Sequence, residues 1–354
     1  MAYTTIDLPT DYFNTVLYTG NSSTQSITGV GFQPDLVWIK DRTGATATYS
    51  PYLFDAIRTA TKYIRSNSSD AEATGANYLT SFDADGFSLG SFFGVNATGD
   101  SIVAWNWLAN NTSGSSNTAG SITSTVSANT TSGFSIVSYT GTGANATIGH
   151  GLGVAPAMVI IKDRDTSVNW SVNNQPLNAS LGDYTRYLTL DATSAVSGPG
   201  NTQYQNAAFT STVFNVGTNT TTNNNTKNFI AYCFASIKGF SKIGIYTGNG
   251  STDGTFVYTG FKPAWVLMKV SSTTDGWLLM DNKRDTYNQV INQLEPNTSN
   301  AASDNTARAM DFLSNGFKFR STNTQNNQSG ATYIYMAFAE NPFVSSTGIP
   351  TTAR

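Results

Sequence analysis

Short apolar runs alternate with clusters of Gly, Asn, Asp, Ser and Thr along the whole chain. The runs are rich in Val, Ile, Tyr, Phe, Trp and Thr, which is typical of β-strands separated by turns. Three runs are almost continuously apolar, and this pattern predicts central strands that are covered on both faces. They are PDLVWIK (34–40), PAMVIIK (156–162) and PAWVLMK (263–269).

These three runs belong to a repeat. A Tyr-Thr-Gly triplet begins at residues 18, 139 and 246, and the proline that opens each run follows its tyrosine by 16, 17 and 17 residues. Each copy then ends in an aromatic-rich strand, IVAWNW, FIAYCF or YIYMAF. Pattern and spacing together predict three tandem copies of one module.

We therefore expect an all-β fold of three mutually similar β-sandwich modules, jelly-roll-like in architecture. Module 1 spans 1–110, module 2 spans 133–237, and module 3 spans 238–354 with a C-terminal tail. Between the first two modules, the uncharged Ser/Thr/Gly/Asn segment 111–132 indicates a linker or an exposed sheet edge. One short helix is predicted in module 1, over 51–66, because apolar residues recur there at spacings of three and four.

Composition narrows the function classes. Only 12% of the residues are charged, the net charge is −3, and no run of Lys or Arg occurs, so the electrostatic footprint of a nucleic-acid-binding protein is missing. The N-terminus lacks the features of a signal peptide, and no run of about 18 apolar residues follows. We expect synthesis in the cytoplasm, no membrane insertion and no nucleic-acid partner. Because Cys233 is the only cysteine, an intrachain disulfide is excluded.

Catalytic and metal chemistry find little support in the sequence. His150, the only histidine, lies between two glycines, and we expect a tight turn in which it bonds to backbone. The segment DADG (83–86) resembles the start of a calcium loop, but FDADGF (82–87) aligns with FLSNGF (312–317), which favours a type I′ hairpin turn. The aspartates leave a glycosidase open as a less favoured alternative. We predict no catalytic residue, no metal and no cofactor.

Two arginines and two tryptophans are the binding candidates. Arg58 and Arg284 each lie three residues after an aspartate, either as a local ion pair or as an arginine that binds a ligand. Trp170 and Trp277 precede loops that differ between the copies, so they are the better candidates for an exposed aromatic platform, whereas the other four tryptophans lie in repeated strands and predict packing. The lysines that end the apolar runs are interpreted as solubilising charges: Lys40, Lys162 and Lys269.

The sequence resembles a family of marine tailed-bacteriophage virion structural proteins. The motifs that carry the resemblance are GFSIVSYTG, IGHGLGVAPAMVIIKDR, GFSKIGIYTGNGSTDGTFVYTGFKPAW and YIYMAFAENPF, and the match covers nearly the whole chain. In module 1 the usual Arg-Gly of the family pattern is Arg58-Thr59 here. The resemblance implies a tail fibre, a tail-associated adhesin or a capsid-surface protein, with lectin-like β-sandwich modules and no catalytic residues to transfer.

These observations lead to three hypotheses about a protein of the virion, whose partners would be other virion proteins and, in a homo-oligomer, further copies of itself. In the first, a host-attachment appendage contacts surface glycans through the amide groups of segments 221–226 and 323–329. In the second, a capsid decoration or cement protein locks neighbouring subunits together. The third and least favoured is a polysaccharide depolymerase.

Overall fold

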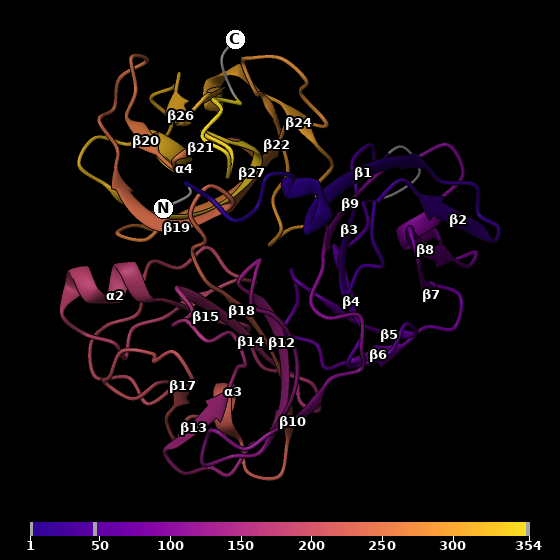
Figure 1. Cartoon of the computed structure of the whole chain (residues 1–354), viewed down its shortest axis with the longest axis vertical. Coiled ribbons are helices and arrows are strands. Elements are labelled where there is room, and N and C mark those ends of the chain that lie inside the picture. Colours follow the sequence, from indigo (N-terminus) through magenta and orange to yellow (C-terminus); the bar gives the residue numbers. More distant parts are fainter. Residues whose placement is uncertain (1–2, 45–47, 352–354) are drawn as a thin grey trace.

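The computed structural model describes residues 3–44 and 48–351. Over these residues the chain is nearly all β, and every ladder between named strands is antiparallel. Figure 1 shows three lobes grouped around a common centre, which are modules 1, 2 and 3 in chain order. The predicted all-β class of β-sandwich modules is confirmed.

Module 1 has a six-stranded sheet in the order β1-β9-β3-β4-β5-β6 and a three-stranded sheet in the order β2-β8-β7. A single 3₁₀ turn, η1, precedes the first strand. The elements are η1 (Pro9–Asp11), β1 (Phe13–Thr19), β2 (Gln25–Thr28), β3 (Leu36–Asp41), β4 (Tyr52–Asp55), β5 (Lys62–Arg65), β6 (Ala73–Thr74), β7 (Leu79–Asp83), β8 (Gly86–Leu89), α1 (Phe93–Asn96) and β9 (Ser101–Trp107).

Module 2 has a seven-stranded sheet, β10-β11-β12-β18-β14-β15-β16, and the small sheet β13-β17. Segment 111–132 supplies β10 and β11, which extend the large sheet beyond β12, so it forms a sheet edge rather than a linker. The elements are β10 (Ser115–Asn117), β11 (Ser124–Asn129), β12 (Phe134–Thr140), β13 (Ala146–Gly149), β14 (Met158–Asp163), β15 (Ser171–Asn174), α2 (Gln175–Leu181), β16 (Leu188–Thr189), β17 (Val213–Val216), α3 (Thr220–Asn223) and β18 (Asn228–Phe234).

Module 3 has a four-stranded sheet, β19-β27-β21-β22, with the smaller sheets β20-β26-β25 and β23-β24. Its strand β21 pairs with β27 on one side and with β22 on the other. The elements are β19 (Ser241–Thr247), β20 (Phe256–Tyr258), β21 (Phe261–Val270), β22 (Trp277–Asp281), β23 (Asn292–Gln293), β24 (Ser303–Asp304), η2 (Thr306–Arg308), β25 (Met310–Leu313), β26 (Gly316–Phe319), α4 (Thr324–Asn327) and β27 (Thr332–Pro342).

The Tyr-Thr-Gly triplet ties the first long strand of each module to its short helix. In module 2 the Tyr139 hydroxyl donates to the carbonyl of Thr222 at 2.6 Å, and the tyrosines of the other two triplets do the same in α1 and α4. A Cβ on Gly141 would lie only 2.3 Å from the carbonyl oxygen of Asn224, with equally short approaches at Gly20 and Gly248. Glycine is therefore required where the backbones meet.

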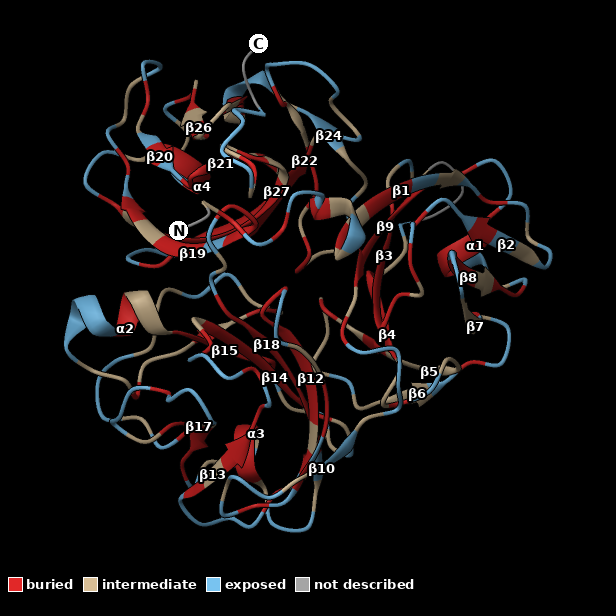
Figure 2. Cartoon of the chain, viewed as in Figure 1, coloured by how far each residue is buried: buried red, intermediate tan, exposed pale blue. Residues whose placement is uncertain are grey.

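Each large sheet separates two hydrophobic cores. In β3, Val37 and Ile39 point into the core of module 1, whereas Leu36 and Trp38 point into a core shared by all three modules. β14 and β21 divide in the same way between the shared core and the cores of modules 2 and 3. Figure 2 shows the buried strands turned toward the centre. The predicted coverage on both faces is confirmed, and the second cover comes from the neighbouring modules.

The helix predicted over 51–66 is not formed, and this prediction is wrong. Strands β4 and β5 occupy the segment as a hairpin in which Leu53 pairs with Ile64. All four residues of β4 are buried, so the strand lacks the alternation of apolar and polar residues that marks a half-exposed strand. Apolar residues at helical spacing are therefore buried here on the two faces of a sheet.

Candidate functional site

Arg58 lies inside the junction between modules 1 and 2. Its side chain is 0% exposed; it forms an ion pair with Asp55, donates to the carbonyl of Leu53 at 2.9 Å and lies 3.3 Å from the Tyr232 hydroxyl of module 2. Burial alone would lower the pKa of Arg58, but the charge of Asp55 and the neighbouring acceptors raise it above the ordinary value. Glu72 completes the network, 3.5 Å from Arg58 and 2.9 Å from Arg164.

Arg284 has the same local arrangement at the junction between modules 3 and 1. Its Nε donates to Asp281 at 2.7 Å, and Asp281 also accepts the indole N–H of Trp105 from module 1 at 3.1 Å. The Arg284 side chain is 1% exposed. Both arginines form ion pairs that join modules, and neither presents a surface to a ligand. The alternative of a ligand-binding arginine is wrong for both positions because their side chains are enclosed.

The junction between modules 2 and 3 has uncharged residues at the positions of this aspartate–arginine pair. Strand pairing places Asn174 of module 2 where modules 1 and 3 have Asp55 and Asp281. Its side chain accepts the backbone N–H of Leu177, which stands in the place of the arginine. Met336 of module 3 occupies the position of Tyr232 and Trp105 in the other copies. At these positions the junction therefore has neither the carboxylate and arginine nor the hydroxyl or indole donor of the facing strand.

Trp170 and Trp277 are also buried, with exposed fractions of 0% and 1%. The Trp170 indole donates to the carbonyl of Arg65 in module 1 at 2.8 Å, and the Trp277 indole donates to the carbonyl of Thr189 in module 2 at 2.9 Å. The expected exposed platform is therefore wrong at both positions. Each tryptophan closes a module junction, because the face that a lone module would expose is covered by its neighbour.

The three lysines that end the apolar runs are buried rather than solubilising. Lys162 donates to the carbonyl of Ser69 in module 1 at 3.0 Å, Lys269 to Thr193 in module 2 at 3.2 Å, and Lys40 to Thr298 in module 3 at 3.0 Å. Burial lowers the pKa of each lysine to about 8. The sequence-based interpretation as surface charges is wrong, since each ammonium group crosslinks two modules.

His150 forms the predicted turn bonded to backbone. Its Nδ1 accepts the N–H of Leu152 at 3.2 Å, which leaves Nε2 as the donor to the carbonyl of Thr210 at 3.1 Å. Burial lowers the pKa of the imidazole, which favours its neutral form. Its hydrogen-bonding atoms are therefore engaged in holding the loop before β14.

Segment 83–86 is a hairpin turn, as predicted, but of a different type. Asp83 pairs with Gly86, so residues 84–85 are central, not 85–86 as in the predicted type I′ turn. The Asp85 carboxylate accepts the N–H groups of Gly31 and Gly29, and a Cβ on Gly86 would lie 1.9 Å from the carbonyl oxygen of Ile27. Within 3–44 and 48–351 no cluster of three His, Cys, Asp or Glu side chains could hold a metal ion.

The amide-rich segments 221–226 and 323–329 are partly buried and partly exposed. They contain the short helices α3 and α4, in which Asn223 and Asn327 are completely buried. The Asn223 amide donates to two carbonyls, at 2.5 and 2.8 Å, while its oxygen accepts a backbone N–H, and Asn327 and Asn96 make equivalent bonds. The amides of Asn223 and Asn327 are therefore used inside the fold, whereas Asn225 is exposed, and the expected glycan contact through these segments stays a prediction.

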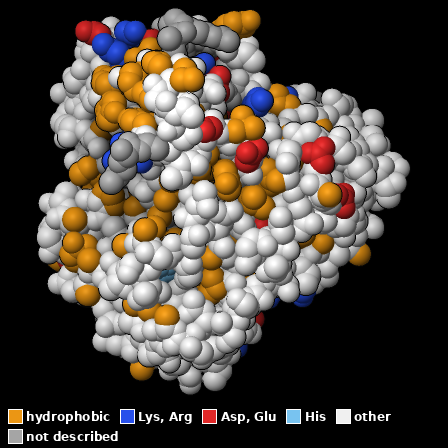
Figure 3. All heavy atoms as spheres, in the orientation of Figure 1, with side chains coloured by type: hydrophobic (Ala, Val, Ile, Leu, Met, Phe, Trp, Pro, Cys, Tyr) orange, Lys and Arg blue, Asp and Glu red, His pale blue; other side chains and the backbone are white. Residues whose placement is uncertain are grey.

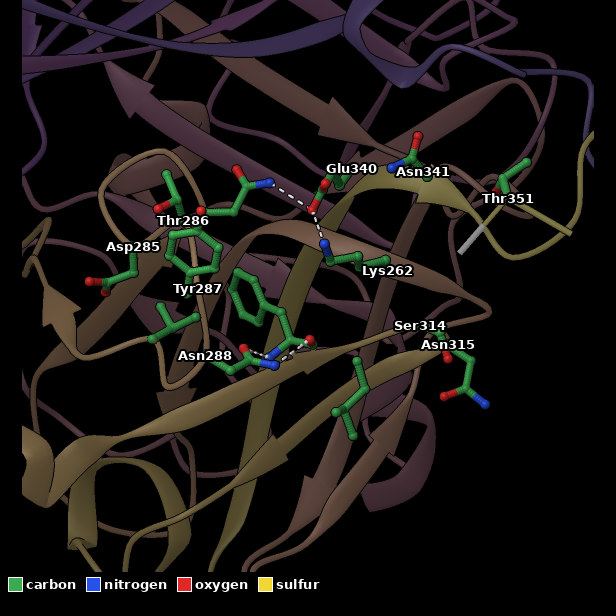
Figure 4. Close-up of a pocket in the computed structure, with 14 residues that line it drawn as sticks. Lys262, Asp285, Thr286, Tyr287, Asn288, Ser314, Asn315, Glu340, Asn341 and Thr351 are labelled. Atoms are coloured by element: carbon green, nitrogen blue, oxygen red, sulfur yellow. Dashed lines mark hydrogen bonds and ion pairs between the residues drawn. The ribbon is translucent and has the colours of Figure 1, made fainter. Parts of the chain in front are cut away.

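One surface hollow in module 3 combines an exposed aromatic ring with polar side chains. Its volume is about 530 Å³, and it lies between the loop 282–291, the β25–β26 turn and the ends of β21 and β27. Figure 4 shows Tyr287 and Asn288 on the loop side, Ser314 and Asn315 on the turn side, and Lys262 close to Glu340. The size is within the range of about 300–1,000 Å³ that is usual for small-molecule sites.

Hydrogen bonds hold the loop of this hollow in place. The Asn288 side chain donates to the carbonyl of Phe312 and accepts its N–H, both at 2.9 Å. Asp285 accepts the N–H groups of Ile291 and Asn292 at 2.8 and 2.7 Å. The loop therefore presents a defined surface, and Tyr287 at its tip is 83% exposed.

Sequence reasoning missed Tyr287, although it singled out the loops that differ between copies. The signal lies in DTYNQ (285–289), a single aromatic residue within a polar loop that no other module contains. In module 1 the connection from β4 to β5 covers only 56–61, and in module 2 the helix α2 follows β15. The most exposed aromatic residue of module 3 thus lies in the loop that follows the strand of Trp277, and not in the strand itself.

Comparison with known protein families gives one match that spans most of the chain. Residues 8–342 match the family described as Domain of unknown function (DUF7483), and the chain belongs to this family. The curated proteins contain no match to the sequence. Over the residues that the structure describes, no helix is long and apolar enough to cross a membrane.

Proposed function

We propose that this member of a family of unknown function is a non-catalytic structural protein of a tailed-phage virion, in a tail fibre or tail-associated appendage that contributes to attachment to host-surface glycans. The observation that carries the proposal is that the three modules share a common core but differ in their surface loops. This separation of scaffold and loops is typical of binding proteins.

The surface character supports the same proposal. On the face shown in Figure 3 most atoms belong to uncharged polar side chains or backbone, and charged side chains are few. Interactions between hydroxyl or amide groups and neutral ligands change little with ionic strength, because salt screens charges. Such a surface is suited to neutral glycans in a salty medium.

Binding to host cells tests this proposal directly. The purified full chain, labelled with a fluorophore, should bind host cells and should lose most of that binding after periodate oxidation of the cell-surface sugars. Antibody labelling of intact particles should place the chain on the tail. Binding that survives periodate would contradict the glycan role, and labelling confined to the capsid would contradict the appendage role.

The alternative of a capsid decoration protein is favoured by one observation. Phe256 and Tyr258 are 43% and 56% exposed on β20, which is an edge strand of its sheet. Exposed aromatic side chains on an open strand edge are suited to a protein partner. If the chain decorates the capsid, Phe256→Ser combined with Tyr258→Ser should release it from particles. Retention of that variant on the particle would contradict this alternative.

A further inference from the structure

We infer that the hollow around Tyr287 in module 3 is a binding subsite for one neutral pyranose ring of a glycan. The inference rests on the proposed attachment function and names the part of the surface and the class of ligand. Three features of the hollow carry it: the position of Tyr287, the amide side chains of the lining, and the charge of the lining.

Tyr287 is the most exposed large aromatic side chain of the described residues, at 83%. Its loop neighbours are Thr286 and Asn288, and the loop is fixed by the Asn288 and Asp285 bonds, so the ring has no packing role that explains its presence. An aromatic face matches the C–H face of a pyranose, and a ring at the tip of a fixed loop loses little entropy when it stacks on a ligand.

Amide side chains line the same hollow, among them Asn282, Asn315 and Asn341. The Asn282 amide nitrogen donates to Glu340 at 2.9 Å, and its oxygen is buried, so this amide is closed to a ligand. Asn315 and Asn341 are half-buried, and an amide side chain can both donate to and accept from sugar hydroxyl groups.

The charge of the lining favours a neutral sugar over an acidic one. Lys262 is engaged with Glu340 at 2.8 Å, and the Asp285 carboxylate already accepts two backbone N–H groups. The lining thus holds one lysine against two carboxylates, together with the amides of Asn315 and Asn341. A carboxylate or sulfate on the ligand would meet a net negative site, whereas hydroxyl groups meet acceptors and amides.

Ligand-observed NMR of the full chain tests the inference. The probes are the methyl glycosides of glucose, galactose and mannose, with glucuronic acid as the acidic comparison. We expect saturation transfer to at least one neutral glycoside and none to glucuronic acid. Tyr287→Ala should raise the dissociation constant about tenfold, which corresponds to about 1.4 kcal/mol. Tyr287→Phe keeps the ring and should change it less than about twofold.

Tyr258→Ala is the matched control, because Tyr258 is also exposed, at 56%, but does not line the hollow. This variant should bind as the parent does. If Tyr258→Ala weakens binding and Tyr287→Ala does not, or if only glucuronic acid binds, the inference is overturned while the proposed attachment function stands. If no glycoside binds although periodate-sensitive cell binding persists, the inference is again overturned alone. Loss of cell binding by the parent chain would remove the proposed function itself.

Discussion

The junction between modules 1 and 2 allows a quantitative test of how charge is buried in this fold. Replacing Asp55 by Asn removes the negative partner of Arg58, whose side chain is 0% exposed. Removing one partner of a buried ion pair typically costs about 3–5 kcal/mol. Glu72 remains 3.5 Å from Arg58 and offsets part of the charge. We therefore expect Asp55→Asn to lower the free energy of unfolding by about 3 kcal/mol, at the low end of that range.

The module 2–3 junction supplies the matched variant. It has Asn174, Leu177 and Met336 at the positions corresponding to Asp55, Arg58 and Tyr232. The triple change Asp55→Asn, Arg58→Leu and Tyr232→Met copies that set into the first junction. Glu72 keeps its bond to Arg164 at 2.9 Å, so no charge of the network is left buried alone. The remaining loss is the donor to the Leu53 carbonyl, which should cost about 1 kcal/mol.

Urea unfolding followed by tryptophan fluorescence measures both variants, because several tryptophans lie in the shared core. The triple variant should be about 2 kcal/mol more stable than Asp55→Asn alone, although it carries two further substitutions. The critical result is that the triple variant is more stable than the single variant. A triple variant as unstable as the single one, or a single variant that costs less than about 1 kcal/mol, would refute the argument from buried charge.

Five further substitutions, one of them a control, test other parts of the fold by urea unfolding. Gly141→Ala should cost about 2–3 kcal/mol because the new Cβ would lie 2.3 Å from a carbonyl oxygen, whereas Gly198→Ala, with nothing within 4 Å, should change little; equal effects would contradict this account. Thr59→Gly should stabilise by about 0.5–1 kcal/mol since Thr59 has a φ of 77°, and a loss of stability would count against it. Trp170→Phe should cost about 1–2 kcal/mol through the lost bond to a carbonyl and should leave sugar binding unchanged. Burial lowers the pKa of Lys162 from 10.5 to about 8, so the unfolded chain binds more protons between these values and the unfolding free energy rises with pH there. Between pH 8 and 9.5 the increase in unfolding free energy should be about 1.5 kcal/mol smaller in Lys162→Met than in the parent chain. The same increase in both proteins would contradict the lowered pKa of this lysine.

The module itself could be predicted from the sequence because its determinants are local. Tyr139 bonds to a short helix and Gly141 passes under a backbone carbonyl, and both requirements recur in each copy at fixed spacing. The continuous apolar runs likewise indicated burial on both faces. What covers the second face could not be predicted, because Trp38 carries no sign of which distant strand will lie against it.

The errors about individual side chains have the same origin. Lysine at a strand end is usually exposed, yet Lys162 reaches the carbonyl of Ser69, 93 residues earlier, across a junction that the sequence does not reveal. Trp277 was selected because a variable loop follows its strand, but it pairs with Lys269 inside the sheet. Tyr287, in the loop itself, has no such pairing partner. For these side chains the residue type predicted the wrong location, because packing between distant parts of the chain decides whether they are exposed.

The junctions also limit how this chain can associate further. Lys162 and Trp170 of module 2 donate to module 1, Lys269 and Trp277 of module 3 donate to module 2, and Lys40 of module 1 donates to module 3. A head-to-tail contact that repeats with one rotation either continues as a filament or closes into a ring. In this chain the contact between modules closes into a ring after three modules, so the donor and acceptor edges of all three modules are used within one chain. Any further contact of the chain, including the proposed contacts with virion proteins or further copies, must therefore use the outer sheets and loops, and the loops are where the three copies differ.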